Sequence, residues 1–302
     1  MPLGSLPTRF RRERVLLIGC GDVGLRVSRQ LRGRVRLLAL TSSPERVPEL
    51  RERGLAVLRG NLDEPASIAR LAGLATRVVH LAPPPGEGAA DPRTTALLRA
   101  LRLRTPPASL VYGSTTGVYG DRGGEKISES HPLAPRTSRA QRRVEAERAV
   151  RFFGRSAPVR AGILRIPGIY APDREGGTPR ERLQRGTPVL RSEDDVFTNH
   201  IHADDLARAL VAALWRGRPQ RVVNAVDDTE LKMGDWFDLA ADVYGLPRPP
   251  RISREDARQA LPPTLLSFMS ESRRLGNDRL KRELRLRLRY PTVRDGLTAG
   301  QR

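Results

Sequence analysis

Cysteine, aromatic residues and long apolar runs are all scarce in this chain of 302 residues. The single cysteine, Cys20, excludes an internal disulfide framework and any all-cysteine metal site. Aromatic residues make up 4% of the chain, so the core must be mostly aliphatic. No apolar run approaches the roughly 20 residues that a membrane-spanning helix needs, so no membrane association is predicted. Hydrophobic residues at 38% and charged residues at 29% are typical of a globular protein.

Lysine is nearly absent as well. It provides three of the 54 basic side chains, and arginine provides the other 51. A formal charge of +20 suits a polyanionic partner, because basic surfaces attract nucleic acid without sequence specificity. The arginines are spread over every segment, however, which indicates compositional bias. Nucleic-acid binding stays a minor alternative, and no specific nucleic-acid partner is predicted.

The first thirteen residues are basic and lack the apolar stretch of a signal peptide. We therefore expect residues 1–13 to form a basic leader on a cytoplasmic protein. The sequence leaves the oligomeric state open.

Short apolar runs alternate with amphipathic stretches through the first half of the chain. The runs predict strands, and the stretches between them predict helices. Because the runs are nearly all apolar, they are typical of strands covered on both faces. The pattern predicts an α/β protein with a doubly wound parallel sheet. The predicted strands cover residues 15–18, 35–40, 56–59, 77–81, 109–112 and 162–165, and the predicted helices cover 23–31, 47–53, 66–71, 94–102 and 139–153.

Glycine and proline interrupt this alternation after Arg165. A helix over 204–214, a strand over 221–226 and a helix over 234–244 are predicted beyond that point, followed by proline-rich chain from 247 to 263. Ligands of open α/β sheets bind beyond the carboxyl ends of the strands. We predict a nucleotide-binding domain over 14–166, with returning segments near 200–226. A smaller C-terminal lobe, over 167–199 and 227–302, is predicted to bind the substrate.

A G-x-G-x-x-G element, Gly19-Cys-Gly21-Asp-Val-Gly24, follows the first predicted strand and begins the first predicted helix. The first glycine permits a tight turn, the second lets the backbone approach a pyrophosphate, and the third lets the helix pack on the strand. Asp22 and Val23 begin the helix, whose amides and partial positive charge favour phosphate. The element predicts a Rossmann fold that binds a dinucleotide, with a merely structural turn as the alternative.

The second predicted strand ends in small hydroxyl residues, Thr41 and Ser42, where an NAD enzyme usually has an acidic residue. The first acidic residue is Glu45, and Arg46 follows it. A 2′-phosphate can be accommodated there, so NADP is favoured as the cofactor and NAD stays the alternative. An ordinary hydroxyl-capped turn also explains the two hydroxyls.

Asn61 and Leu62 follow the third predicted strand, where a polar group can face the adenine of a dinucleotide. Asp63 comes next and Pro65 follows closely. A helix cap is an equally good interpretation of this segment.

Four further segments carry a resemblance to a known family. They are Val78–Ala82, Gly113–Gly120, Leu164–Tyr170 and Asn199–Ala207. With the glycine element, the chain resembles the extended short-chain dehydrogenases/reductases, the NAD-dependent epimerase/dehydratase group, over nearly its full length. The resemblance implies that Leu81 and Ala82 lie beside the diphosphate and ribose of the cofactor.

Typical members of that family carry a Tyr-x-x-x-Lys pair on the helix after the fifth strand, with Glu four residues beyond the Lys. Counting back from Glu147 places these positions at Arg143 and Arg139. Arg143 can donate to a ribose or phosphate, but Arg139 cannot exchange a proton near neutral pH. The chain is therefore predicted to be an atypical member. Alternatively, Arg143 and Glu147 form a surface ion pair one helical turn apart.

The resemblance places Ser114, Thr115 and Tyr119 near the nicotinamide or the substrate, and these three are the predicted catalytic residues. Tyr119 could act as a proton donor if its pKa were lowered, or it could simply pack and hydrogen-bond. His80 follows a buried strand and is interpreted first as a core histidine. His200 and His202 have the spacing of metal ligands but no third ligand, so no metal site is predicted.

Two classes of function follow from these residues. The first is an NADP-dependent oxidoreductase that acts on a small carbonyl or alcohol compound by a non-standard mechanism. The second is a catalytically silent NADP-binding protein that senses redox state or regulates a partner. A small-molecule substrate is predicted for the first, and the sequence does not name it.

Overall fold

The computed structural model describes residues 13–299 of the chain. The chain divides into two compact units, each built from three segments of sequence. Apart from residue 13, the predicted basic leader lies outside the described residues. The assignment of a substrate-binding lobe concerns function and stays a prediction. The first unit comprises 1–114, 137–164 and 210–222, and the second comprises 115–136, 165–209 and 223–302.

A seven-stranded parallel sheet dominates the fold, as the sequence predicted. From β1 the chain first builds the sheet in one direction, through β2 and β3, and then in the other, through β4 and β5. The order therefore reverses between β1 and β4, where ligands of doubly wound sheets bind. In spatial order the strands are β12 (Arg221–Asn224), β7 (Arg160–Ile166), β5 (Ser109–Thr115), β4 (Arg77–His80), β1 (Arg14–Ile18), β2 (Arg36–Thr41) and β3 (Ala56–Arg59).

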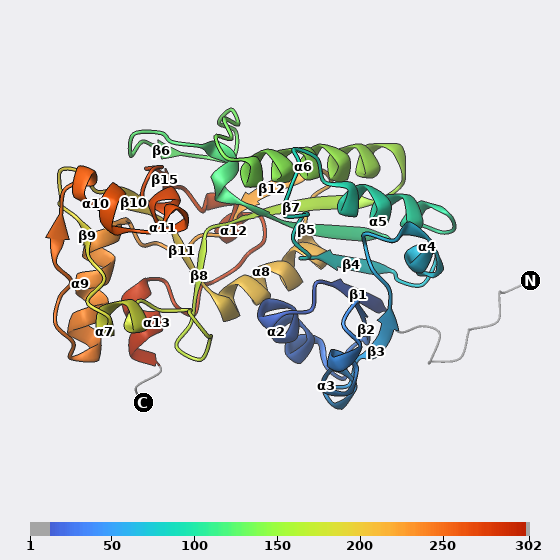
Figure 1. Ribbon diagram of the computed structural model, residues 1–302. Coiled ribbons are helices and arrows are strands. Elements are labelled where there is room, and N and C mark those ends of the chain that lie inside the picture. The colour runs from blue at the N-terminus through green and yellow to red at the C-terminus, as the bar shows by residue number, and fades with distance from the viewer. Residues whose placement is uncertain (1–12, 300–302) are drawn as a thin grey trace, which may run out of the picture. The chain divides into compact units, whose positions relative to one another are not determined.

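Helices connect these strands and cover both faces of the sheet (Figure 1). The helices α5 and α6 lie on one face, and α2 lies on the other. Proline stands in the first turn of α3, α4 and α5, where its missing N–H costs no helical hydrogen bond. The helices are α2 (Asp22–Leu31), α3 (Val47–Glu52), α4 (Pro65–Ile68), α5 (Pro92–Arg102) and α6 (Ser138–Ser156), with short 3₁₀ turns at Pro44–Arg46 and Ala69–Leu71.

The core of the first unit is aliphatic, as the low aromatic content predicted. Leucine, isoleucine and valine side chains of β1, β2, β4 and β5 pack against α5 and α6. Phe153 of α6 and Tyr112 of β5 are the only aromatic members of this core cluster within the described residues. The apolar faces of α5 and α6 therefore hold both helices against the sheet.

The second unit is built from short strand pairs and short helices. Its strand pairs are β6 (Lys126–Ile127) with β15 (Arg274–Leu275), β8 (Gly168–Tyr170) with β11 (His200–His202), β9 (Val189–Leu190) with β14 (Arg251–Ile252), and β10 (Phe197–Thr198) with β13 (Leu231–Lys232). Its helices are α7 (Arg180–Gln184), α9 (Met233–Tyr244), α10 (Arg254–Ala260), α11 (Pro263–Phe268), α12 (Asp278–Arg282) and α13 (Val293–Thr298), and α8 (Ala203–Arg216) runs between its residues and those of the first unit.

The second unit has a core of its own around α9. Trp236 and Phe237 are buried there with Tyr170, Leu190 and Leu297. Across the described residues, no helix combines the length and the apolar character needed to cross a membrane.

Candidate functional site

The glycine element forms the turn between β1 and α2, and its three glycines meet different surroundings. Gly19 has a φ of +82°, and a Cβ there would lie 2.4 Å from the backbone nitrogen of Ala82. A Cβ on Gly24 would lie 3.1 Å from the carbonyl oxygen of Gly19. A Cβ on Gly21 would meet nothing within 4 Å. Gly19 and Gly24 thus stand where the backbone packs too closely for a side chain, whereas Gly21 leaves open space at the start of α2.

The start of α2 offers backbone amides to that open space. The first-turn amides of a helix have no acceptor within the helix, and no side chain caps α2. Val23 is buried, and Asp22 accepts a hydrogen bond from Nε of Arg26 at 3.0 Å. Because Arg26 neutralises Asp22, the helix N-terminus keeps its attraction for an anion.

Leu81 and Ala82 close the other side of the glycine turn. Their backbone amides donate to the carbonyl oxygen of Ile18, at 2.7 and 3.1 Å. These bonds hold the chain after β4 directly against Gly19, so that no side chain fits between them. Leu81 and Ala82 thus lie beside the glycine element, and their predicted position beside the diphosphate and ribose of the cofactor stays a prediction.

The end of β2 forms a hydroxyl-capped turn. Oγ1 of Thr41 accepts from the backbone amide of Ser43 at 3.1 Å, and Ser42 is exposed. Arg46 follows in the 3₁₀ turn and contacts Glu49 at 3.4 Å. Both charges act on Cys20 of the glycine element, whose pKa burial raises to about 11. Arg46 thus lies in the 3₁₀ turn that follows the end of β2, with Glu49 as its ion-pair partner.

Asn61 organises the loop after β3. Its Oδ1 accepts from the amide of Asp63 at 3.1 Å, and Leu62 is buried in the core. Asp63 forms a bidentate ion pair with Arg93, at 2.6 and 2.7 Å, and this hydrogen bond lowers the pKa of Asp63. Asp63 therefore ties this loop to α5.

Arg143 projects from α6 onto the end of β5. Its Nη1 donates to the carbonyl oxygen of Gly113 at 2.7 Å and to the hydroxyl of Tyr112 at 3.0 Å. Its Nε is buried and has no hydrogen-bond partner within the described residues. The sequence interpretation missed Tyr112, which holds Arg143 in place; an apolar strand gave no signal for that role.

Ser114 is buried and donates its hydroxyl proton to Oε1 of Glu147 at 2.7 Å. Glu147 is only 1% exposed. The alternative of a surface ion pair between Arg143 and Glu147 is therefore wrong, because the α6 carboxylate faces β5 instead of solvent.

Thr115 and Tyr119 lie in the second unit, around a 3₁₀ turn over Thr116–Tyr119. Thr115 is partly exposed and accepts from the amide of Gly117. Tyr119 is wholly buried, donates to Oδ1 of Asn224 at 2.7 Å, and lies under the guanidinium of Arg165. These surroundings are those of a residue that packs and hydrogen-bonds, which favours this interpretation of Tyr119 over that of a proton donor.

His80 ends β4 and is wholly buried beside the ring of Tyr112. Thr94 donates its hydroxyl proton to Asp91 at 2.7 Å, so its oxygen accepts from Nε2 of His80 at 2.9 Å. Nδ1 of His80 has no partner within residues 13–299. Burial lowers the pKa of His80 from 6.5 to about 3, so this histidine stays neutral near neutral pH.

Stability should therefore fall on mild acidification. Below pH 6.5 the unfolded chain binds a proton at His80, whereas the folded chain does not until about pH 3. Between pH 6.5 and 5 this difference lowers the free energy of unfolding by about 1.6 kcal/mol. His80→Gln should reduce that loss by the same amount, as measured by urea unfolding at the two pH values. His131→Gln is the control, and an equal effect of both variants would contradict the assignment to His80.

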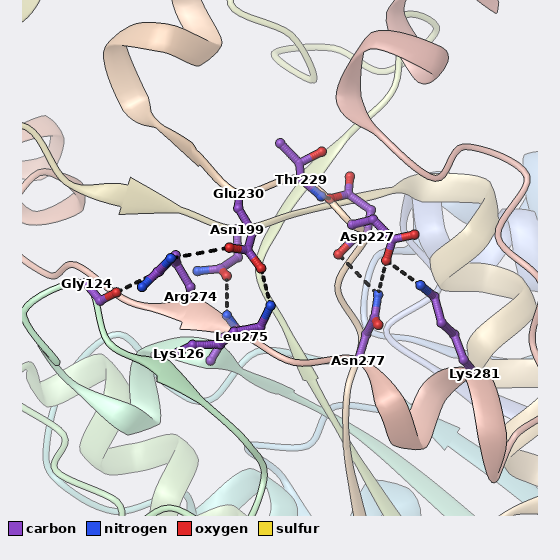
Figure 2. A network of polar contacts seen from close by, with 11 residues as sticks. Gly124, Lys126, Asn199, Asp227, Thr229, Glu230, Arg274, Leu275, Asn277 and Lys281 are labelled. Carbon is purple, nitrogen blue, oxygen red and sulfur yellow. Dashed lines mark hydrogen bonds and ion pairs between the residues drawn. The ribbon is translucent and has the colours of Figure 1, made fainter.

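The segment from Asn199 to Ala207 makes contacts within the second unit, and Figure 2 shows Asn199 beside Leu275. The side-chain amide of Asn199 accepts from the backbone of Leu275 at 3.0 Å and donates to that of Arg273 at 2.9 Å. Nδ1 of His202 accepts from the amide of Asp204 at the start of α8. Among the described residues, no group of three or more His, Cys, Asp or Glu side chains could hold a metal ion.

Two charged clusters flank Asn199 in the same view (Figure 2). Glu230 pairs with Lys126 and Arg274, and Arg274 also donates to the carbonyl oxygen of Gly124 at 2.8 Å. Asn277 donates to Asp228 at 2.8 Å. These contacts join distant segments of the second unit.

The residues around the glycine element fit a dinucleotide. Gly21 leaves room for a pyrophosphate against the amides of α2, and Arg143 has a buried, unpartnered Nε at the end of β5. Gly21 follows β1, where the strand order of the sheet reverses, and Arg143 contacts the end of β5, two strands away from β1 in the sheet.

Comparison with known proteins agrees with this geometry. The chain belongs to the NAD-dependent epimerase/dehydratase family, whose model matches residues 15–225. The family assignment and the Rossmann-like fold predicted from the sequence are thereby confirmed.

Individual relatives share about a third or less of their residues with this chain. The chain is 30% identical over 144 residues to a 3-diazoavenalumate denitrifying reductase of a Streptomyces species, which covers 45% of each chain. The chain spans about half the length of the curated relatives it matches. A functionally unknown conserved protein from Silicibacter pomeroyi is 31% identical, with a TM-score of 0.82 over 96% of this chain and 98% of its own. MoeE5, solved with UDP-glucose and NAD, is 22% identical, with a TM-score of 0.75 over 94% and 96%.

Proposed function

We propose that the chain is an NADP-dependent oxidoreductase that acts on a small carbonyl or alcohol compound. The open space at Gly21 carries this proposal, because it lies at the N-terminus of α2 and a Cβ there would meet nothing within 4 Å. The proposal includes a cytoplasmic location. It also makes the chain an atypical member of its family, since Arg139 and Arg143 stand where typical members have Tyr and Lys.

The residues described above are proposed to contact different parts of the cofactor. Gly19, Gly21, Asp22, Val23 and Gly24 would hold the pyrophosphate, and Leu81 and Ala82 would line its other side. Asn61 and Leu62 would flank the adenine. When bound, the cofactor supplies or accepts a hydride.

Arg143 is proposed to bind the nicotinamide ribose. Its Nη1 is held by Gly113 and Tyr112, so the guanidinium has a fixed direction, and its Nε is left to donate. An arginine in this position can bind a hydroxyl but cannot exchange a proton near neutral pH. The chain thus keeps the binding role of the usual Lys and gives up its role in proton transfer.

Thr115 is proposed to hold the reacting oxygen of the substrate. Of the three predicted catalytic hydroxyls, those of Ser114 and Tyr119 donate to Glu147 and Asn224. The Thr115 hydroxyl is partly exposed, and its bond to the Gly117 amide uses only its acceptor side. Its proton is therefore left to bond a carbonyl oxygen, while Ser114 positions β5 against α6.

Arg46, together with Thr41 and Ser42, is proposed to select NADP. Arg46 lies in the 3₁₀ turn just after the end of β2, and its contact to partly exposed Glu49 at 3.4 Å is long enough to yield to a phosphate. Arg46→Ser is expected to weaken NADP⁺ binding about tenfold and to leave NAD⁺ binding unchanged. Calorimetric titration with both nucleotides measures this, with Arg51→Ser as the control. Equal weakening for both nucleotides would contradict the assignment.

The test of the function is a spectrophotometric assay of NADPH oxidation with a panel of small aldehydes, ketones and oxoacids. Turnover with at least one compound is the expected result. Saturable NADPH binding without turnover would instead favour a silent redox sensor, which the absence of Tyr at position 139 and of Lys at position 143 supports. Absence of NADPH binding would contradict both.

A further inference from the structure

Three arginines gather on the first turns of α6. Arg142 is 7% exposed and donates through Nη1 to the carbonyl oxygen of Gly88 at 2.6 Å. Arg143 donates to Gly113 and Tyr112. The Nε atoms of Arg142 and Arg143 are both buried without a hydrogen-bond partner in the described part of the chain. Arg139 lies one turn before Arg143 and is exposed.

No carboxylate neutralises this cluster. Within residues 13–299, none of the three guanidinium groups makes an ion pair, whereas the acidic residues nearest in sequence have other partners. Glu145 accepts from the amide of Asp91 at 2.7 Å, and Glu147 accepts from Ser114. Arg139 keeps part of its surface exposed, but its guanidinium loses some of its surrounding water; this desolvation, followed by repulsion from Arg143 and Arg142, lowers the pKa of Arg139.

Such a cluster is costly unless an anion completes it. A buried donor without a partner is destabilising, and like charges in close proximity repel each other. The cost is typical of a site that a ligand satisfies, and guanidinium groups bind carboxylates and phosphates through paired hydrogen bonds. The cluster adjoins the carboxyl end of β5, where the ligands of doubly wound sheets bind.

We propose that Arg139, with Arg143 behind it, binds the acidic group of an anionic substrate that carries a carboxylate or a phosphate. The inference rests on the proposed function and gives its substrate class. According to this inference, Arg139, at the position of the usual catalytic tyrosine, binds the substrate instead of transferring a proton. Arg142, buried where it donates to Gly88, adds a further positive charge nearby.

Matched ligands test the charge requirement. Oxamate is a carboxylate that mimics an oxoacid and is not reduced, oxamide is its neutral counterpart, and methyl phosphate represents the phosphate class. Binding is measured calorimetrically on the whole protein saturated with NADP⁺. We expect oxamate or methyl phosphate to bind at physiological salt and oxamide not to bind; which anion binds identifies the acidic group.

Two arginine variants locate the site. Arg139→Gln is expected to weaken binding of the anion tenfold or more and to leave NADP⁺ binding unchanged. Arg148→Gln on the opposite side of α6 is the matched control, because it removes the same charge from an exposed position. It is expected to change neither.

Failure of the inference differs from failure of the proposed function. If NADP⁺ binds but neither anion does, or if oxamide binds as well as oxamate, the anionic substrate site is overturned and the cofactor site stands. If Arg139→Gln weakens NADP⁺ binding as much as anion binding, the cluster serves the cofactor and the inference is again overturned. If NADP⁺ itself does not bind, the proposed function fails.

Discussion

Replacing Gly21 with alanine should leave the free protein as stable as the wild type and weaken binding of NADP⁺ about a hundredfold. The new methyl group would meet nothing within 4 Å, and Gly21 has extended backbone angles, φ −80° and ψ −157°, that alanine adopts. Alanine is a poorer helix cap than glycine by some tenths of a kcal/mol, but it loses less backbone entropy on folding, by about 0.4–1 kcal/mol. These two effects nearly cancel. In the bound state the methyl group occupies the space proposed for the pyrophosphate.

Two other glycines make this prediction specific. Gly19→Ala should lose both stability and binding, because its positive φ and the backbone of Ala82 at 2.4 Å leave no room for a methyl group. Gly162→Ala in β7 should change neither, because its nearest contact would be 3.9 Å away. Thermal unfolding and calorimetric titration of the three variants measure both quantities. Unchanged NADP⁺ affinity in Gly21→Ala would show that the open space is not a pyrophosphate site.

Replacing Asp205 with alanine should destabilise the second unit by about 3–5 kcal/mol. Asp205 is wholly buried at the start of α8 and accepts from Arg208 at 2.6 Å. It also accepts from the backbone amides of Arg289 at 3.0 Å and Tyr290 at 2.9 Å. Its removal leaves two amides without their acceptor and Arg208 without its carboxylate, although Nη1 of Arg208 keeps its bond to the carbonyl oxygen of Arg287 at 2.7 Å. A donor that loses its buried partner costs its desolvation energy.

Hydrogen exchange at the amides of Arg289 and Tyr290 measures this loss locally. Because every 1.4 kcal/mol corresponds to a tenfold change, exchange there should be at least about a hundredfold faster in Asp205→Ala. Asp242→Ala, which removes an exposed ion pair with Arg248, should leave these amides protected. Wild-type protection in Asp205→Ala would contradict the role assigned to this carboxylate.

The sheet could be predicted because its strands are short, mostly apolar runs, and those in the middle of the sheet are buried on both faces. The strand over 56–59 has the predicted bounds. Strand β5 runs on to Thr115, three residues beyond the prediction, because Gly113 and Ser114 are buried in the sheet without being apolar. The proline-rich stretch from 247 to 263 hid α10, which Ser253 caps by accepting from the amide of Asp256. A cap residue followed by polar helix formers gives no apolar periodicity to recognise.

The glycine element could be predicted because its function depends on local backbone geometry. The partners of the other site residues could not, because they come from distant segments. Tyr112 and Arg143 are 31 residues apart, and Ser114 and Glu147 are 33 apart. The spacing on α6 alone suggested a surface pair of Arg143 with Glu147. The packing of α6 on β5 instead gives each of them its own partner on β5.

A crystal structure of the protein with NADPH tests the central claim most directly. The account predicts the pyrophosphate in the space at Gly21, against the first-turn amides of α2, with the guanidinium of Arg143 on the nicotinamide ribose and that of Arg46 on the 2′-phosphate. A dinucleotide bound elsewhere, or one whose pyrophosphate does not contact the glycine element, would contradict it.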